Sequence, residues 1–210
     1  LENTMRHFMN IYPPNNGWSR LGIVLCLGLR IDKVISEEEY CFLPDYYLKT
    51  LQSATINGLP IVAKEKTVYQ GVPRTSDPIW TIPLAVFWLM AILILLLYVK
   101  SSKNSIKNAI EILLFSISGF LGFFLLGLWF LTDHFTAQNN LNVLWAMPLH
   151  IILPFLKDKL KRKYLLGYAV LLGLVLVNWV WFPQNLNNAF FPIIGLLAII
   201  SFLKSKRENS

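Results

Sequence analysis

Charged residues are scarce in this 210-residue chain: they make up 15% of it, whereas 55% of its residues are hydrophobic. A chain this apolar, with a mean hydropathy of +0.50, is not an ordinary soluble domain. The sequence also lacks a phosphate-binding loop and the GxSxG, HExxH and CxxC motifs. These absences exclude the common signatures of soluble enzymes, and we expect neither a cofactor nor a metal ion.

Acidic residues are fewer than basic ones, which gives a net charge of +7. Residues 1–77 hold eight side chains of each sign, whereas residues 78–210 hold eleven basic and four acidic ones. The whole excess therefore belongs to the hydrophobic part of the chain. There it indicates membrane topology and not a nucleic-acid-binding face, so we expect no nucleic-acid partner.

Cysteine is limited to Cys26 and Cys41, both before the first long apolar stretch. They can form a disulfide in an oxidising compartment, but two isolated thiols do not determine one. Whether they pair is left open.

Lys and Arg are absent from every second connection between the apolar stretches that follow Pro78. The five stretches are the predicted transmembrane segments: Ile79–Val99, Ile112–Thr132, Leu141–Leu156, Tyr164–Phe182 and Ala189–Leu203. Basic clusters follow the first, third and fifth stretches, at residues 100–107, 157–163 and 204–207. Only five spans place all three clusters on one side of the bilayer. Basic residues beside membrane segments stay in the cytoplasm, which puts the C-terminus inside and residues 1–75 outside.

A signal sequence is also missing, since the chain starts at Leu1 without a basic region and an apolar core. The predicted orientation nevertheless requires residues 1–75 to cross the membrane. We therefore expect this chain to be the C-terminal part of a longer protein, or the product of a truncated reading frame.

The external segment has several weak element signals. They predict a helix in Leu1–Tyr12, a buried loop with a helical turn in Trp18–Arg30, and a strand in Val62–Tyr69. Ser36 and Glu39 form a capping box for a helix that reaches about Ala54, with Pro44 near its first turns. Asn57-Gly58 predicts a tight turn.

The predicted fold is mainly α: a five-transmembrane-helix bundle preceded by a small, incomplete α+β extracytoplasmic segment. The domains are residues 1–76, too poor in apolar residues for a core of their own, and residues 77–210. The two outer loops share a Trp–Gln–Asn-rich–Pro order, beginning at Trp129 and at Trp181. This order fits an internal duplication and equally fits the general preference of loops for Asn and of interfaces for Trp.

The densest polar cluster of the membrane part lies in and just after the loop between the second and third stretches. Its candidate site residues are Asp133, His134, Thr136, Asn140, Asn142 and Trp145. An Asp–His pair at a membrane interface can orient lipid headgroups, relay a proton or bind a metal. The alternative, which the pattern alone favours, is a solvated loop that caps the adjacent helices.

Two polar residues, His150 and Asn178, lie within predicted spans. Such residues usually face other helices, and the two are candidates for a hydrogen bond with each other. A transporter would need more ionisable groups in mid-membrane than His150 alone, so a transport function is disfavoured.

Two sequence blocks resemble a known family. The first is Gly17-Trp18-Ser19-Arg20-Leu21-Gly22-Ile23, continued by Leu27-Gly28, Asp32-Lys33 and Phe42-Leu43-Pro44-Asp45-Tyr46. The second is Thr132-Asp133-His134, followed by Asn140-Leu141-Asn142-Val143-Leu144-Trp145 and Pro148-Leu149. In this order they resemble the C-terminal part of the Lnb-type lipoprotein N-acyltransferases of Gram-negative bacteria: the end of the periplasmic domain and the five-helix membrane module.

The resemblance implies an acyltransferase of the bacterial inner membrane, with a phospholipid as acyl donor and a lipoprotein as acceptor. In the family, the nucleophilic cysteine belongs to the periplasmic domain, and neither Cys26 nor Cys41 matches it. The chain alone is therefore expected to be inactive. The alternative is a non-catalytic integral membrane scaffold or assembly partner.

Overall fold

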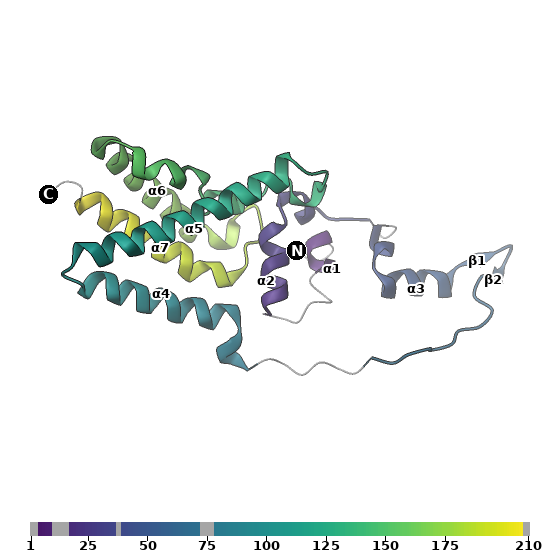
Figure 1. The fold of residues 1–210 in the computed structure, drawn as a ribbon. Helices are drawn as coiled ribbons and strands as arrows, with labels where there is room; N and C mark the ends of the chain where they lie inside the picture. The colour runs from purple at the N-terminus through teal and green to yellow at the C-terminus, as the bar shows by residue number, and fades with distance from the viewer. Residues whose placement is uncertain (1–3, 10–16, 37–38, 72–77, 208–210) are drawn as a thin grey trace.

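The computed structural model describes residues 4–9, 17–36, 39–71 and 78–207, and it is mainly helical (Figure 1). Four long helices, α4 to α7, lie side by side in a bundle, with α1 and α2 near one end of it. A thin arm that carries α3, β1 and β2 extends away from that end. The molecule thus has a bundle, a group of short helices against it, and an arm.

The first two long helices are α4, Pro83–Lys100, and α5, Asn104–Phe130. Pro83 occupies the first turn of α4, where proline's missing N–H costs nothing. α4 has 18 residues and α5 has 27, lengths of about 27 and 40 Å at the rise of an α-helix. Both can cross the hydrocarbon core of a bilayer, which is about 30 Å thick.

The other two long helices are α6, Asp158–Val177, and α7, Phe191–Arg207, and they pack closely on each other. Among the described residues, three segments are long and apolar enough to span a membrane: Pro83–Lys100, Asn104–Phe130 and Asn188–Arg207. α6 begins with a run of basic residues that lowers its hydropathy. The count of five spans therefore remains a prediction.

The third predicted stretch, Leu141–Leu156, is not an α-helix. It forms two 3₁₀ helices, η5 (Leu141–Leu144) and η6 (Pro148–Phe155). Pro148 starts η6 and Pro154 lies inside it. Proline lacks the N–H that an α-helix needs, and its ring clashes with the preceding turn. The chain therefore forms 3₁₀ helices here, which are wound more tightly than an α-helix.

The segments between the long helices and in the external part are short. They are α1 (Met5–Met9), α2 (Trp18–Cys26), η1 (Leu29–Asp32), η2 (Glu39–Phe42), α3 (Pro44–Ser53), η3 (Ile79–Thr81), η4 (Phe135–Ala137), η7 (Trp179–Trp181) and η8 (Asn188–Phe190). The strands β1 (Thr55–Ile56) and β2 (Leu59–Pro60) pair antiparallel around the predicted Asn57-Gly58 turn, where both residues have positive φ.

Some of the predictions for the external segment are confirmed by the structure, and others are wrong. The capping box is present, because Glu39 Oε2 accepts from the Ser36 backbone N–H at 2.7 Å, but η2 follows it and α3 starts only at Pro44. The segment Trp18–Arg30 is more helical than the predicted loop with a helical turn: it contains the nine-residue helix α2, Trp18–Cys26, and the start of η1. The predicted strand Val62–Tyr69 is wrong: these residues have no strand partner in the described part of the chain. The Gly71–Pro78 connection lies almost wholly outside the described residues.

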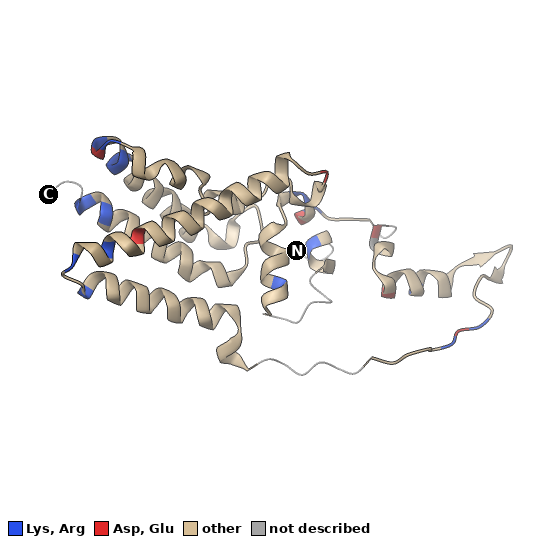
Figure 2. Cartoon of the chain, viewed as in Figure 1, with Lys and Arg blue, Asp and Glu red and all other residues tan. Residues whose placement is uncertain are grey.

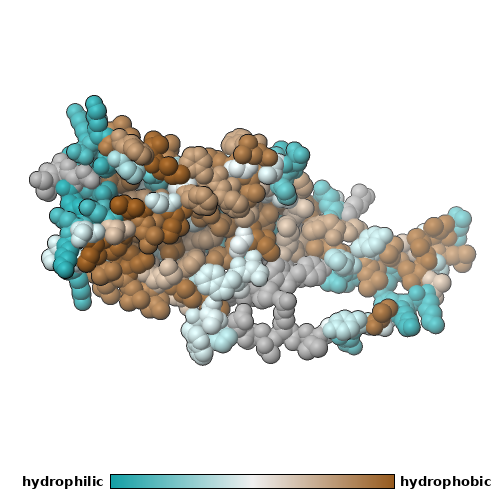
Figure 3. Space-filling model, in the orientation of Figure 1, coloured by the Kyte–Doolittle hydropathy of each residue, from teal (hydrophilic) through white to brown (hydrophobic). Residues whose placement is uncertain are grey.

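The face of the bundle that Figure 3 shows is mostly hydrophobic, apart from the hydrophilic side chains at one end. Large apolar side chains on α4 and α5, such as Leu93 and Phe120, are more than half exposed. Leu165, Leu172 and Ile194 meanwhile form a buried core between the helices. An apolar outside around an apolar inside is the arrangement that a lipid solvent requires.

The basic side chains of the bundle gather at one of its ends (Figure 2). This end contains the connection from α4 to α5, the start of α6 and the last turn of α7. The three sequence clusters therefore share one side of the bundle, as the alternating pattern predicted. We call this side the basic end, and the opposite side, which faces α1 and α2, the outer end.

Candidate functional site

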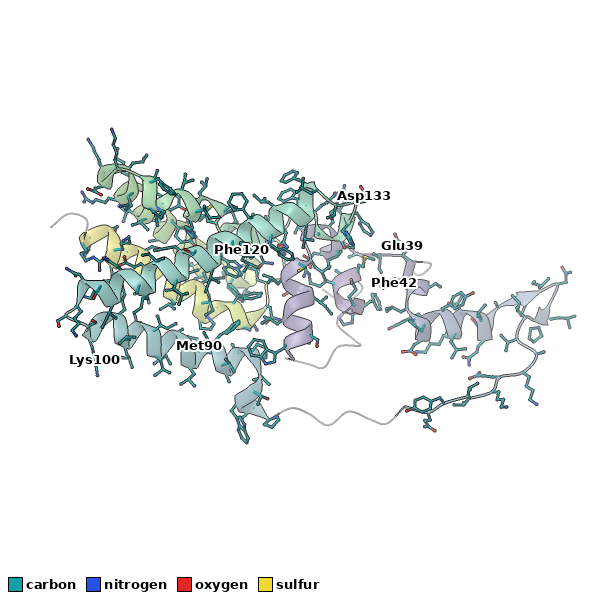
Figure 4. All side chains as sticks on the ribbon, viewed as in Figure 1. Glu39, Phe42, Met90, Lys100, Phe120 and Asp133 are labelled. Atoms are coloured by element: carbon teal, nitrogen blue, oxygen red, sulfur yellow. The ribbon has the colours of Figure 1, made fainter. Side chains whose placement is uncertain are left out.

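The predicted outer cluster divides into an exposed half and a buried half. Asp133 and His134 are exposed in the turn that follows α5, and Figure 4 shows Asp133 at the outer tip of that helix. Thr136 is half-buried in η4. Asn140 and Asn142 are both 1% exposed, and Trp145 is buried as well. The six residues therefore lie in one region, but they differ in how deeply they are buried.

The buried half forms a network of side-chain amides. Asn140 Nδ2 and Asn142 Nδ2 donate to the Leu25 carbonyl at 2.8 and 3.2 Å, and Asn142 Nδ2 also donates to Asn140 Oδ1. Gln184, from the connection between α6 and α7, donates to the Leu27 carbonyl at 3.1 Å. Amides serve this role because each offers both donors and acceptors. The network satisfies the last carbonyls of α2, which end without a helical partner.

Backbone hydrogen bonds also attach the residues that follow α2 to the outer loop. The Gly28 N–H donates to the Thr136 carbonyl at 2.8 Å, and the Leu29 N–H donates to the Asn139 carbonyl at 3.1 Å. A Cβ on Gly28 would lie only 1.9 Å from the Gln138 carbonyl oxygen. Only glycine permits this approach of two backbones.

A buried ion pair holds the N-terminal helix to the same place. Arg6 and Asp32 are joined by two hydrogen bonds, the shorter at 2.6 Å, and Arg6 also donates to the Gly28 carbonyl. Arg6 is 2% exposed. A charge so deeply buried requires a partner, so α1, η1 and the outer loop form one packed unit.

Trp145 connects this unit to the interior of the bundle. Its indole N–H donates to Asn142 Oδ1 at 2.9 Å, and its carbonyl accepts hydrogen bonds from Tyr168 and Ser118. Ser118 Oγ lies 3.0 Å from His150 Nδ1. A continuous polar path thus runs from the outer network to His150.

His150 is 2% exposed and makes edge contacts with the rings of Phe115 and Tyr168. The proposed hydrogen bond with Asn178 is not formed. Asn178 is exposed at the end of α6, where its amide donates to the Leu174 carbonyl of its own helix. Asn178, at a helix end, hydrogen-bonds a carbonyl that the helix leaves unpaired, whereas His150 lies within hydrogen-bond distance of the Ser118 hydroxyl on α5.

The sequence analysis missed Glu111, a second buried ionisable group of the bundle beside His150. It is 1% exposed and belongs to α5, which starts at Asn104 and not at the predicted Ile112. Its carboxylate accepts from Tyr98 at 2.6 Å, and it pairs with Lys204 and Arg207. Its spacing from Lys107, four residues earlier, was the available signal for a helix that begins before the apolar stretch.

Neither cysteine has the features of a nucleophile. Both are free and half-buried, with Cys26 at the end of α2 and Cys41 in η2. Burial raises the pKa of the Cys26 thiol, which lowers its thiolate fraction at neutral pH. Among the residues that the structure describes, no cluster of three His, Cys, Asp or Glu side chains could hold a metal ion.

These features define an integral membrane protein with an apolar helical bundle and a packed polar outer end. The family model described as the Lnb transmembrane domain matches residues 75–208, and the chain belongs to this family. Comparison with curated proteins and with solved structures gave no match.

Proposed function

We propose that the chain is the membrane module of a lipoprotein N-acyltransferase-like protein that acts at the periplasmic face of the bacterial inner membrane. The family match over residues 75–208 carries this proposal. The basic end of the bundle faces the cytoplasm, and the outer end faces the periplasm. Both substrates, the phospholipid acyl donor and the lipidated protein, are available in the outer leaflet.

The reaction proceeds in two acyl transfers. A thiol gives up its proton and attacks an ester carbonyl of the phospholipid; a thioester forms, the ester C–O bond breaks, and the lysophospholipid oxygen takes up that proton and leaves as an alcohol. The α-amine of the lipoprotein's lipidated cysteine then attacks the thioester, forms an amide and releases the thiol. No cofactor or metal is required for either step.

Neither Cys26 nor Cys41 supplies that thiol. Cys26 is half-buried at the foot of α2, and burial raises its pKa. Cys41 lies in η2, beyond the elements that pack on the outer end, and its Sγ faces Thr50 Oγ1 at 3.4 Å. We therefore expect the nucleophile to lie outside residues 1–210 and this part alone to be inactive.

The module's own contribution is to position the external part of the protein at the bilayer surface. The amide network of Asn140, Asn142 and Gln184 and the Arg6–Asp32 pair fix α1, α2 and η1 on the outer end. The exposed Asp133 and His134 lie beside this attachment, where they can contact headgroups or substrate. A fixed orientation of this kind raises the effective concentration of a thiol at the membrane surface.

The test uses the complete protein that contains this sequence, in a strain without its own lipoprotein N-acyltransferase. N-terminal lipopeptides are measured by mass spectrometry. We expect N-acylated lipopeptides with the wild type and with the double variant Cys26→Ser, Cys41→Ser. Gly28→Ala should lower the N-acylated fraction, because the added methyl forces the outer loop away, whereas Gly22→Ala, with open space around its Cβ, should not.

The scaffold alternative predicts a different result. A non-catalytic scaffold leaves N-acylation absent in that strain with the wild type. If N-acylation is present and Gly28→Ala leaves it unchanged, the chain takes part in the reaction but the outer attachment has no role in it.

A further inference from the structure

We propose that the basic end of the bundle holds a binding site for the phosphate headgroup of an anionic phospholipid, in a cavity between α5, η6, α6 and α7. This site lies at the end of the bundle opposite to the outer cluster. The proposal does not depend on acyl transfer, and it concerns the leaflet on the other side of the membrane.

The cavity has a volume of about 300 Å³. This is the lower limit of small-molecule sites and suits a headgroup with its glycerol, but not two acyl chains. Side chains from four elements form it: Glu111 and Phe115 from α5, His150 and Leu153 from η6, Lys161 from α6 and Lys204 from α7. It is therefore a property of the assembled bundle.

Cations outnumber carboxylates around the cavity. Lys161 and Lys204 line it, and Arg207 reaches the same Glu111 carboxylate that pairs with Lys204. Among the described residues, the carboxylates that pair with these cations are Glu111, and Asp158 at 3.6 Å from Lys161 on the exposed surface. Further Lys and Arg residues cover this end (Figure 2). Basic pockets between transmembrane helices on the cytoplasmic side are typical sites for anionic headgroups.

His150 supplies a polar atom deeper in the cavity. Its Nε2 is buried and has no hydrogen-bond partner among the described residues, although its Nδ1 faces Ser118. The Ser118 hydroxyl has one hydrogen, which can be donated to the Trp145 carbonyl or to Nδ1. In the tautomer in which it is donated to Nδ1, Nε2 carries the proton and can donate to an acceptor in the cavity. The Trp145 carbonyl keeps its hydrogen bond from Tyr168 in this tautomer.

The position of His150 fits the ester region of a lipid. It lines the same cavity as Lys161 and Lys204. A phosphate held at the two lysines would therefore place the glycerol esters of the lipid in the cavity that His150 lines.

The remaining lining favours a lipid over a soluble phosphate. Phe115 and Leu153 are buried and apolar. Ile112 also lines the cavity and is 63% exposed on the apolar surface of α5, so the cavity opens onto the side that faces lipid. Acyl chains can leave through this opening and continue along the bundle.

The test places the full chain in nanodiscs with equal amounts of phosphatidylglycerol and phosphatidylcholine, and native mass spectrometry counts the lipids that stay bound. We expect the wild type to retain phosphatidylglycerol preferentially. Lys161→Gln should lower its retention about fivefold, the effect of one basic residue near an anionic headgroup. Lys159→Gln is the matched control, because it removes the same charge from an exposed position of α6 outside the cavity.

Two further variants test the deeper contact. His150→Gln keeps a donor and should retain phosphatidylglycerol, whereas His150→Leu should lose it. Equal retention of both lipids, or equal effects of Lys161→Gln and Lys159→Gln, would overturn the proposal. Displacement of the lipid by millimolar glycerol phosphate would also overturn it, since the site would then bind a soluble phosphate. If His150→Leu fails to fold, the two lysine variants decide.

Discussion

At the scale of single residues, Glu111 is a carboxylate buried among the helices of the bundle. Glu111 is buried on α5, and its two oxygens bind Tyr98 from α4 and the two cations of α7. One side chain thus connects three helices. Such a group persists in the membrane because its charge is matched and hydrogen-bonded.

Replacement of Glu111 by Gln should destabilise the protein by about 3 kcal/mol, because Lys204 and Arg207 lose their counter-charge while they remain partly buried. Thermal unfolding in detergent measures this change. Asp158→Asn is the control: Asp158 is 79% exposed, and its pair with Lys161 is worth less than about 1 kcal/mol. Equal shifts for the two variants would contradict the role of Glu111.

At the scale of elements, the unusual feature is the 3₁₀ segment that connects the outer end to the basic end. The stretch Leu141–Leu156 has 16 residues, which as an α-helix would measure about 24 Å and fall short of a hydrocarbon core of about 30 Å. The 3₁₀ helix η6 comprises eight of these residues and measures about 16 Å at the 3₁₀ rise of about 2.0 Å per residue. That this stretch crosses the membrane remains a prediction.

Two glycines on α5 allow this segment to pack closely against that helix. A Cβ on Gly122 would lie 1.9 Å from the Ala146 carbonyl oxygen, and a Cβ on Gly119 would lie 3.1 Å from His150 Cβ. Small residues allow the close backbone approach by which membrane helices pack. The contact also buries the backbone of η6, which protects its polar groups from lipid.

Gly122→Ala should therefore destabilise the bundle by about 1–3 kcal/mol, the usual effect of overpacking. Gly127→Ala, on the same helix and with open space around its Cβ, is the matched control and should leave stability unchanged or slightly higher. The loss of tryptophan fluorescence on heating in detergent compares them. The close approach of α5 and η6 would be refuted by identical transition temperatures.

At the scale of the whole molecule, the distribution of basic residues distinguishes the two ends of the bundle and predicts its orientation in the membrane. The basic clusters lie at one end, while the other end holds the external helices (Figures 1 and 2). Fusions of alkaline phosphatase and of green fluorescent protein measure the orientation in the cell. We expect fluorescence and no phosphatase activity after Lys163 and after Arg207, and the reverse after Gln138, because basic flanks remain in the cytoplasm. Phosphatase activity after Lys163 would invert this topology.

Much of the fold could be predicted because lipid is a simple solvent. A run of apolar residues with no charge, such as Pro83–Val99, can only be a helix in a bilayer, so α4 and α5 were located, although α5 starts eight residues before the predicted limit. The Asn57-Gly58 turn was equally clear, since positive φ selects these residues. The Val62–Tyr69 strand failed because an alternating pattern needs a partner strand, which the sequence does not reveal.

Membership of the Lnb transmembrane-domain family and the grouping of the basic connections on one face could be read from the sequence, because hydropathy and charge act locally along the chain. The hydrogen-bond partners of the polar residues, in contrast, depend on the tertiary structure. It paired Asn142 with a carbonyl 117 residues earlier in the chain and His150 with Ser118 instead of Asn178. Buried polar groups take whichever complementary group packing brings to them, and that choice depends on elements far apart in the sequence.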